Sequence, residues 1–268
     1  MWNRGPLSGA RITPSGTWGW RVPAELRATL LGRIGYIEGW RLQEAVASRL
    51  ADGGPERLLL LEHDPVYTIG KRGSLDHLTA SPAELRASGA TAYRVDRGGD
   101  ITYHGPGQLV GYPIVSLGDA PDVVAYVRAL EGGLRAALAD LGVVSRAIDG
   151  KTGVWVALAD GRDAKIAAIG VRVSRGITRH GFALNVGVDL AAFERMIPCG
   201  FDHEVASLAR LGIDAALADV ARACGIRVSE HLGRRLVWDA SVEAARDDEI
   251  PPAAPVRTAL DLLAAVAA

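Results

Sequence analysis

The sequence contains two cysteines, and only one of them lies in a setting that favours chemistry. Cys199 stands between Pro198 and Gly200, two residues that shape the backbone into a loop rather than a helix. Cys224 lies near the end of a predicted helix, where a small apolar filler is the expected role. A cysteine in such a loop can be exposed and oriented, although a buried, inert thiol is the more common role of a lone cysteine. Cys199 is therefore the candidate nucleophile.

A thiol nucleophile needs a nearby cation, because a free cysteine with a pKa of about 8.5 is only slightly ionised at neutral pH. Lys165 is the best candidate, since it begins the apolar run 166–171 and a sheet would anchor its backbone. A lysine at the start of a strand is more often an ordinary edge residue, and a separation of 199 − 165 = 34 residues does not pair it with Cys199. His104 and His180 are further candidates, as bases or substrate contacts, or as residues that satisfy backbone groups beside turns.

Residues 97–108 form the densest cluster of unusual residue types. Gly98 and Gly99 lack a Cβ, so a ligand or another backbone segment can approach closely. Gly105-Pro106-Gly107 predicts a tight reversal. Hydrogen-bonding side chains come from Thr102, Tyr103, His104 and Gln108. The segment is typical of a pocket wall for a polar or amide-bearing chain, and a hairpin turn with incidental polar residues explains its composition equally well.

Apolar spacing predicts the strands and helices that would position these residues. A helix is expected over residues 39–52, with apolar residues four apart, and a longer one over 122–141, opened by Asp119 or Pro121 and closed by Gly142. A third is expected over 214–223, ending at Gly225. Apolar runs predict strands at residues 58–61, 66–69, 91–95, 109–115, 153–158, 165–173 and 177–186. Strands and helices that do not strictly alternate indicate an α/β or α+β fold with one mixed sheet and flanking helices.

The composition limits the classes of protein to which the chain can belong. The chain has 268 residues, 49% of them hydrophobic and 23% charged, which is typical of a globular protein that folds without disulfides. A net charge of −1 predicts neither nucleic acid nor an anionic membrane as the main partner. We find no apolar span, signal segment or metal-ligand spacing, and therefore expect a cytoplasmic protein without a metal site. Residues 1–29 are expected to be a disordered extension, 30–237 the catalytic domain and 238–268 a tail that ends in a helix over 256–267.

Five sequence blocks follow one another along the chain. They read LEHDPVYT from Leu61, RGGDITYHGPGQ from Arg97, KIAAIGVRV from Lys165, HGFALNV from His180 and IPCG from Ile197. In this order the five blocks resemble those of the lipoyl(octanoyl) transferase family, and ordered blocks are far more specific than a lone glycine motif. The resemblance spans roughly residues 30–211 and leaves both ends unassigned.

The resemblance implies the fold of the biotin and lipoate protein ligases. It implies that Cys199 carries an acyl thioester and that Lys165 lowers its pKa. It also implies a substrate site formed by three segments. Their residues are Arg97, Gly98, Gly99, Asp100, Ile101, Thr102, Tyr103 and His104, then Ala168, Ile169 and Gly170, then Gly181, Phe182 and Ala183. We expect Gly98, Gly99, Ala168 and Gly181 to leave room for the acyl chain.

The reaction implied is the first step of endogenous protein lipoylation. An octanoyl group would pass from octanoyl-acyl carrier protein to a lysine of an apo lipoyl domain, in 2-oxoacid dehydrogenase complexes or the glycine cleavage H protein. No resident cofactor is expected, because octanoyl-phosphopantetheine arrives on the carrier. Basic residues are candidates for docking these acidic partners: Lys71, Arg72, Arg172, Arg175 and Arg179. Each of them is equally well explained as a solvated surface charge.

Three other functions compete with this interpretation. An ATP-dependent lipoate or biotin ligase would share the fold, but it would use phosphate-binding lysines and no cysteine nucleophile. A non-catalytic paralogue would be free to lose Cys199 and Lys165. A cysteine hydrolase would prefer a Cys–His pair.

Overall fold

The computed structural model describes residues 24–197 and 204–239, and within them nine strands form one mixed sheet. The strand order is β12-β1-β2-β6-β10-β9-β8-β7, and β11 pairs with β9. Strands β1, β2 and β12 run parallel, whereas β6, β10, β9, β8 and β7 are joined by antiparallel pairings. A small second sheet has the order β4-β3-β5.

The elements alternate irregularly along the chain, as expected for a mixed fold. The helices are α1 (Tyr36–Ala51), α2 (Pro82–Ala87), α3 (Val123–Asp140) and α4 (Leu217–His231). The strands are β1 (Glu25–Ile34), β2 (Glu56–His63), β3 (Val66–Ile69), β4 (Thr91–Arg94), β5 (Ile101–His104), β6 (Gln108–Ile114), β7 (Arg146–Ile148), β8 (Lys151–Ala157), β9 (Asp163–Ser174), β10 (Ile177–Asn185), β11 (Glu204–Val205) and β12 (Arg235–Trp238).

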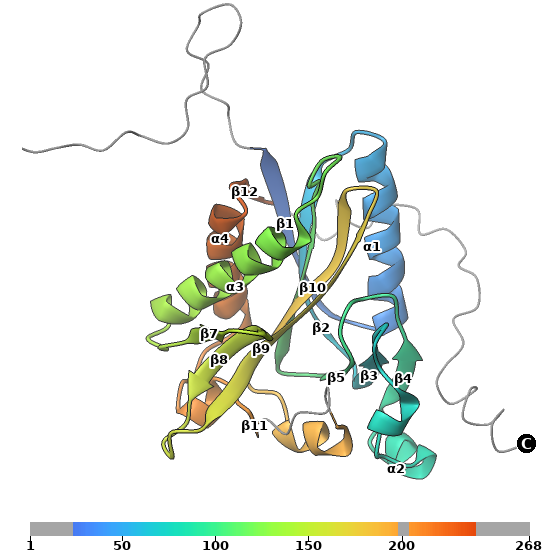
Figure 1. Cartoon of the computed structure of the whole chain (residues 1–268), viewed down its shortest axis with the longest axis vertical. Helices are drawn as coiled ribbons and strands as arrows, with labels where there is room; N and C mark the ends of the chain where they lie inside the picture. The colour runs from blue at the N-terminus through green and yellow to red at the C-terminus, as the bar shows by residue number, and fades with distance from the viewer. Residues whose placement is uncertain (1–23, 198–203, 240–268) are drawn as a thin grey trace, which may run out of the picture.

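Helices cover both faces of the main sheet (Figure 1). On one face α3 and α4 pack against each other and against the sheet, and the largest apolar cluster lies between them. On the other face α1 packs over β2, β6 and β10. Strand β2 is buried along almost its whole length because both of its faces are covered, which explains the uninterrupted leucine run 58–61. The predicted fold class is confirmed.

Four local expectations differ from the structure. Strand β1 begins at Glu25, so residues expected in a disordered extension belong to the sheet. Strand β5 lies within residues 97–108, where no strand was expected, and it pairs with β3. Helix α4 runs through Gly225 to His231, because the missing Cβ of Gly225 admits the ring of Trp238 from β12. The side chain of Asp122 caps α3 by accepting from the Ala125 amide, in place of Asp119 or Pro121. The helix expected over 256–267 lies outside the described residues.

Gly111 on β6 marks a point where two strands approach without room for a side chain. A Cβ on Gly111 would lie 2.1 Å from the Phe182 ring of the neighbouring strand β10. Gly111→Ala should therefore lower the free energy of unfolding by about 1–3 kcal/mol through overpacking. Thermal denaturation measures the effect, and Gly142→Asn, at a left-handed position with open space around it, is the matched control. An unchanged melting temperature for Gly111→Ala would contradict this packing.

Candidate active site

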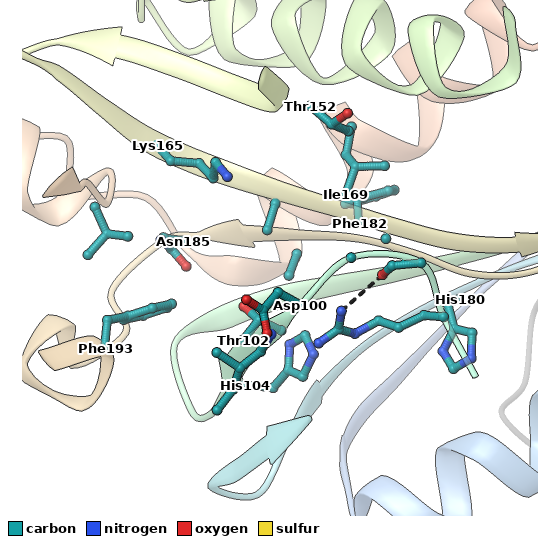
Figure 2. A pocket seen from close by; sticks show the side chains of 18 of the residues that line it. Asp100, Thr102, His104, Thr152, Lys165, Ile169, His180, Phe182, Asn185 and Phe193 are labelled. Atoms are coloured by element: carbon teal, nitrogen blue, oxygen red, sulfur yellow. Dashed lines mark hydrogen bonds between the residues drawn. The ribbon is translucent and has the colours of Figure 1, made fainter. Parts of the chain in front are cut away.

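A single large cavity of about 1330 Å³ collects most of the predicted site residues. Its walls come from the segment before β5, from β5 itself, and from the middle of β9 and β10 (Figure 2). Thirteen of the fourteen predicted substrate residues line it, together with Lys165. Tyr103 does not, because its ring packs against Tyr67 and Phe193 in the core of the small sheet. The structure thus brings the predicted residues together on one cavity.

The side chain of Lys165 is aimed at this cavity by an irregularity in the sheet. The register between β8 and β9 shifts at Val154 and Trp155, so an extra residue of β9 is accommodated next to Lys165. Gly153 leaves space for the methylene stem, whose Cε would lie 3.4 Å from a Cβ at that position. The ammonium Nζ lies 4.8 Å from the centre of the Trp155 ring. A cation held over an aromatic face in this way is stabilised by the ring.

Cys199 lies outside the described residues, as does the rest of segment 198–203. The residues on both sides of that segment are fixed at the cavity. Before it, Met196 lines the cavity and the Ile197 amide donates to the carbonyl of His77 at 2.8 Å. After it, Val205 pairs with Lys165 between β11 and β9, and also lines the cavity. The cavity that contains Lys165 is therefore flanked by both ends of the cysteine-bearing segment.

The buried guanidinium of Arg97 holds the glycine-rich wall in place. Its Nη2 donates to the carbonyl and hydroxyl oxygens of Thr68 at 2.6 and 2.8 Å, and its Nη1 donates to the carbonyl of Gly98 at 3.0 Å. The Gly98 amide in turn donates to the Val171 carbonyl on β9 at 2.9 Å. In this structure Arg97 ties the small sheet to the main sheet.

Gly181 does not provide the open space that the sequence suggested. A Cβ at this position would lie 2.2 Å from the carbonyl oxygen of Gly111, so the neighbouring backbone fills that side. Gly98 has more room, with the Val171 carbonyl as its nearest neighbour at 3.3 Å. The expectation of space for an acyl chain therefore does not hold at Gly181.

Two buried histidines stand beside the cavity in neutral form. His63 donates from Nδ1 to the Ile34 carbonyl at 3.0 Å, so its Nε2 accepts from the Tyr112 hydroxyl at 2.7 Å. Burial lowers the pKa of His63 to about 4. Burial also lowers the pKa of His104 to about 3, helped by the neighbouring His63. Tyr36 stacks on His104 and meets His63 edge-on.

These two histidines should make the protein sensitive to mild acid. Their folded-state pKa values lie below the value of about 6.5 in an unfolded chain, so below that pH the unfolded state binds more protons. Stability is therefore full above pH 6.5 and declines progressively as the pH falls towards 4. We expect the free energy of unfolding to drop by about 2 kcal/mol or more between pH 7 and pH 5. Urea titrations at each pH measure the slope, and His63→Gln should make it shallower. A flat profile over this range would contradict the buried neutral state.

A charged cluster around Asp96 braces the β9–β10 hairpin. Its carboxylate accepts from Arg179 at 2.6 Å and from His180 Nε2 at 2.7 Å, and it pairs with Arg172 at 3.2 Å. Burial opposes ionisation of Asp96, but the His180 hydrogen bond and the two arginine charges outweigh it and lower the pKa to about 2. His180, with a pKa that burial lowers, is held in a left-handed conformation at φ 57°. Arg172 and Arg179, which were expected as docking candidates, are thus engaged in ion pairs within the protein.

Cys224 is completely buried in α4 among the apolar residues of the main core. Burial raises the pKa of its thiol to about 12, so it stays protonated at any physiological pH. The predicted role as an apolar filler is confirmed.

No described helix is both long and apolar enough to cross a bilayer. Among residues 24–197 and 204–239, no group of three or more His, Cys, Asp or Glu side chains is placed to hold a metal ion.

Several residues that line the cavity could not be recognised as site residues from the sequence. They come from elements whose apolar pattern is explained by packing alone, and only their position in the fold reveals them. These residues include Tyr36, Val127, Thr152, Trp155, Phe193 and Met196.

The fold and cavity define a class of protein. Solved structures of lipoate protein ligases share the architecture. A bipartite lipoate protein ligase from Thermoplasma acidophilum superposes with a TM-score of 0.66 at 20% identity, over 84% of this chain and 90% of the other. A lipoate-protein ligase A bound with ATP gives a TM-score of 0.68 at 19% identity, over 84% of this chain and 92% of the other. At this identity the similarity shows the fold.

The sequence comparisons are more specific. Residues 35–226 match the model of the lipoyl protein ligase A/B catalytic domain, and the chain belongs to that family. A protein of Mycolicibacterium smegmatis named octanoyltransferase is 48% identical over 218 residues, which cover 80% of this chain and 92% of the relative. One of Solibacter usitatus with the same name is 47% identical, covering 76% and 90%.

Proposed function

We propose that this protein transfers an octanoyl group from octanoyl-acyl carrier protein to a lysine of apo lipoyl domains through an acyl-Cys199 thioester. The class of reaction, octanoyl transfer in protein lipoylation, rests on the extensive identity with relatives of that name. The route through Cys199 rests on one structural observation. The cavity that holds the Lys165 ammonium is lined on both flanks by the residues that precede and follow the cysteine-bearing segment.

In the first step the Cys199 thiolate attacks the carbonyl carbon of the octanoyl thioester. A new C–S bond forms to Cys199, and the C–S bond to the pantetheine sulfur breaks. The Lys165 ammonium stabilises the attacking thiolate and then gives its proton to the departing pantetheine thiolate. One thioester replaces another, so the step is close to balanced in free energy. No resident cofactor is needed for it.

In the second step the lysine amine of the lipoyl domain attacks the acyl-Cys199 carbonyl. The amine arrives as an ammonium, and neutral Lys165 accepts one of its protons while another leaves to solvent. The C–S bond to Cys199 breaks as the amide forms, and the thiolate–ammonium pair is restored. Because an amide is more stable than a thioester, this step runs downhill.

The apolar part of the cavity suits the acyl chain. Val110, Ile169 and Phe182 line it from β6, β9 and β10, and Val127 lines it from α3. At about 0.8 kcal/mol per buried methylene, an eight-carbon chain gains several kcal/mol by entering such a slot. A shorter chain gains proportionally less, so the slot selects by length.

The partners are expected to dock on a smaller basic surface than the sequence suggested. Lys71 and Arg72 are exposed on the turn after β3, and their amides donate to the Arg97 and Gly99 carbonyls of the cavity wall. Exposed Arg94 donates to the Gly73 carbonyl of the same turn. In the described part of the chain none of these three has an acidic partner, and Arg72 lines the cavity.

Charge reversal tests this docking surface. Lys71→Glu with Arg72→Glu should raise the KM for the carrier about tenfold at low salt and weaken its salt dependence. The matched control is Arg222→Glu with Arg227→Glu on α4, where Arg222 is exposed, Arg227 is half-buried and both are already paired with acids. Steady-state turnover over a range of salt concentrations measures both. An unchanged KM in the first variant would remove the turn from the docking surface.

The ATP-dependent ligase is the alternative, because two solved structures that share this fold are named as lipoate ligases. A transfer assay separates the two activities. Octanoyl-acyl carrier protein without ATP should give octanoylated lipoyl domain, whereas free octanoate with ATP and magnesium should give none. Product that forms only in the second mixture would overturn the proposal in favour of the ligase.

A further inference from the structure

Two buried amide side chains form a continuous hydrogen-bonded chain in the wall of the cavity. Gln108 begins β6 and Asn185 ends β10, and the two residues are register partners. The Gln108 Nε2 donates to Asn185 Oδ1 at 2.9 Å, and the Asn185 Nδ2 donates to the Ala206 carbonyl at 2.9 Å. At the other end, Gln108 Oε1 lies 2.7 Å from His104 Nδ1. Both amides line the cavity, and both are at least 96% buried.

The Ala206 carbonyl fixes the direction of the whole chain. A carbonyl only accepts, so the amide nitrogen of Asn185 faces it and the Asn185 oxygen faces Gln108. Gln108 must then present its nitrogen, which also donates to the Tyr103 carbonyl at 3.2 Å. Its oxygen is left facing His104, which must donate from Nδ1. The imidazole therefore carries its single proton on Nδ1, and Nε2 keeps its lone pair.

That lone pair is available to a ligand. His104 lines the cavity, and within the described ranges no protein group is hydrogen-bonded to its Nε2. Burial lowers the pKa of His104 to about 3, so the ring stays neutral over the physiological range. A neutral imidazole with a bare Nε2 is a hydrogen-bond acceptor that carries no charge. It can hold a substrate N–H group by accepting a hydrogen bond from it.

We propose that Gln108 and Asn185 are positioning residues, which fix His104 so that its Nε2 accepts a hydrogen bond from a substrate N–H during acyl transfer. The inference rests on the proposed function for the identity of that substrate. Two groups supply such an N–H: the attacking amine of the lipoyl-domain lysine and the amides of the pantetheine arm. Both present the same chemistry to Nε2.

The tautomer is the first test, and it does not depend on activity. The full chain is labelled with ¹⁵N-histidine, and the His104 signals are assigned by their loss in His104→Gln. We expect Nδ1 to carry the proton and Nε2 to be bare from pH 6 to pH 8. A spectrum with the proton on Nε2, or with rapid exchange between both nitrogens, would overturn the inference.

Gln108→Leu removes the acceptor for Nδ1 at nearly constant volume. We expect the ring to change to the Nε2–H form and one half-reaction to slow at least tenfold. Asn185→Leu should act in the same direction but less strongly, because the Tyr103 carbonyl still orients Gln108. Thr178→Val is the control: it removes buried hydrogen bonds from the same strand, outside the cavity, and should lower the melting temperature without changing the tautomer or the rates.

Single-turnover mass spectrometry of the two half-reactions identifies the N–H donor. If the Gln108→Leu variant loses its octanoyl group to the lipoyl domain more slowly than wild type, the lysine amine is the N–H donor to His104. If the variant gains the octanoyl group from the carrier more slowly, the pantetheine amide is the donor. Rates unchanged in both despite an altered tautomer would overturn the positioning role. If wild-type protein shows the expected tautomer but no octanoyl transfer, the proposed function fails and the geometry stands. If it transfers octanoyl with the opposite tautomer, only this inference fails.

Discussion

Cys199→Ser should abolish octanoyl transfer, with a fall in kcat of at least about a thousandfold. A serine hydroxyl is barely ionised near neutral pH, and an ammonium at Lys165 cannot bring it into the range where a thiol ionises. The substitution exchanges one sulfur for an oxygen, so folding should be unaffected. Steady-state transfer from carrier to lipoyl domain measures the rate, and circular dichroism with thermal denaturation checks the fold.

Cys224→Ala provides the matched control for this result. Its thiol is fully buried and its pKa is raised to about 12, so it has no route to substrate. We expect the variant to lose about 1 kcal/mol of stability from the small cavity and to retain kcat. An equal loss of activity in the two variants would contradict the assignment of Cys199.

Lys165→Met should lower kcat by about a hundredfold or more and move the ionisation of the Cys199 thiol to higher pH. Methionine keeps an unbranched stem against Gly153 and Trp155, so the change removes mainly the charge and the transferable proton. The rate of iodoacetamide alkylation as a function of pH measures thiol ionisation. Alkylation at pH 9 should recover, whereas transfer should not, because no group is left to move the proton.

Lys165→Arg separates the two roles given to this side chain. Arginine keeps a positive charge but does not release its proton, so thiol alkylation should stay fast while transfer falls. Lys151→Met is the control, since Lys151 is exposed and its Nζ also lies over the Trp155 ring, at 5.5 Å. It should leave thiol ionisation and kcat within about threefold of wild type. A Lys165→Met variant that keeps the wild-type alkylation profile would refute the role of the ammonium.

Much of the architecture was predictable because the buried face of a helix or strand makes apolar residues recur at a regular spacing in the sequence. The leucine run 58–61 and the stripe of α3 both report contact with the core, and both elements lie where the periodicity indicated. The start of β1 at Glu25 was missed because the Gly- and Pro-rich composition of the preceding residues extends almost up to it. Gly225 was misinterpreted because a glycine that admits Trp238 and a glycine that ends a helix look identical in one sequence.

The residues of the site were predictable, but the ion pairs and hydrogen bonds between them were not. The ordered blocks indicated Lys165 and the segment around Arg97, and the structure places them on one cavity. The engagement of Arg172 and Arg179 with Asp96 could not be foreseen, because Asp96 is more than 70 residues away from both arginines. The pairing of β9 with β10 places the two arginines opposite each other, and the hydrogen bond from the Gly98 amide to the Val171 carbonyl brings the segment of Asp96 to β9. The direction of the Gln108–Asn185 chain likewise depends on Ala206, which no local pattern links to either residue.

The central claim is that the octanoyl group rests on the sulfur of Cys199 between donor and acceptor. Intact-mass spectrometry after mixing the protein with octanoyl-acyl carrier protein tests it directly. We predict a mass gain of one octanoyl group, located on Cys199 by peptide mapping, lost on addition of apo lipoyl domain and absent from Cys199→Ser. Rapid transfer to the lipoyl domain with no acylated protein at any time, or acylation that persists in Cys199→Ser, would contradict the account.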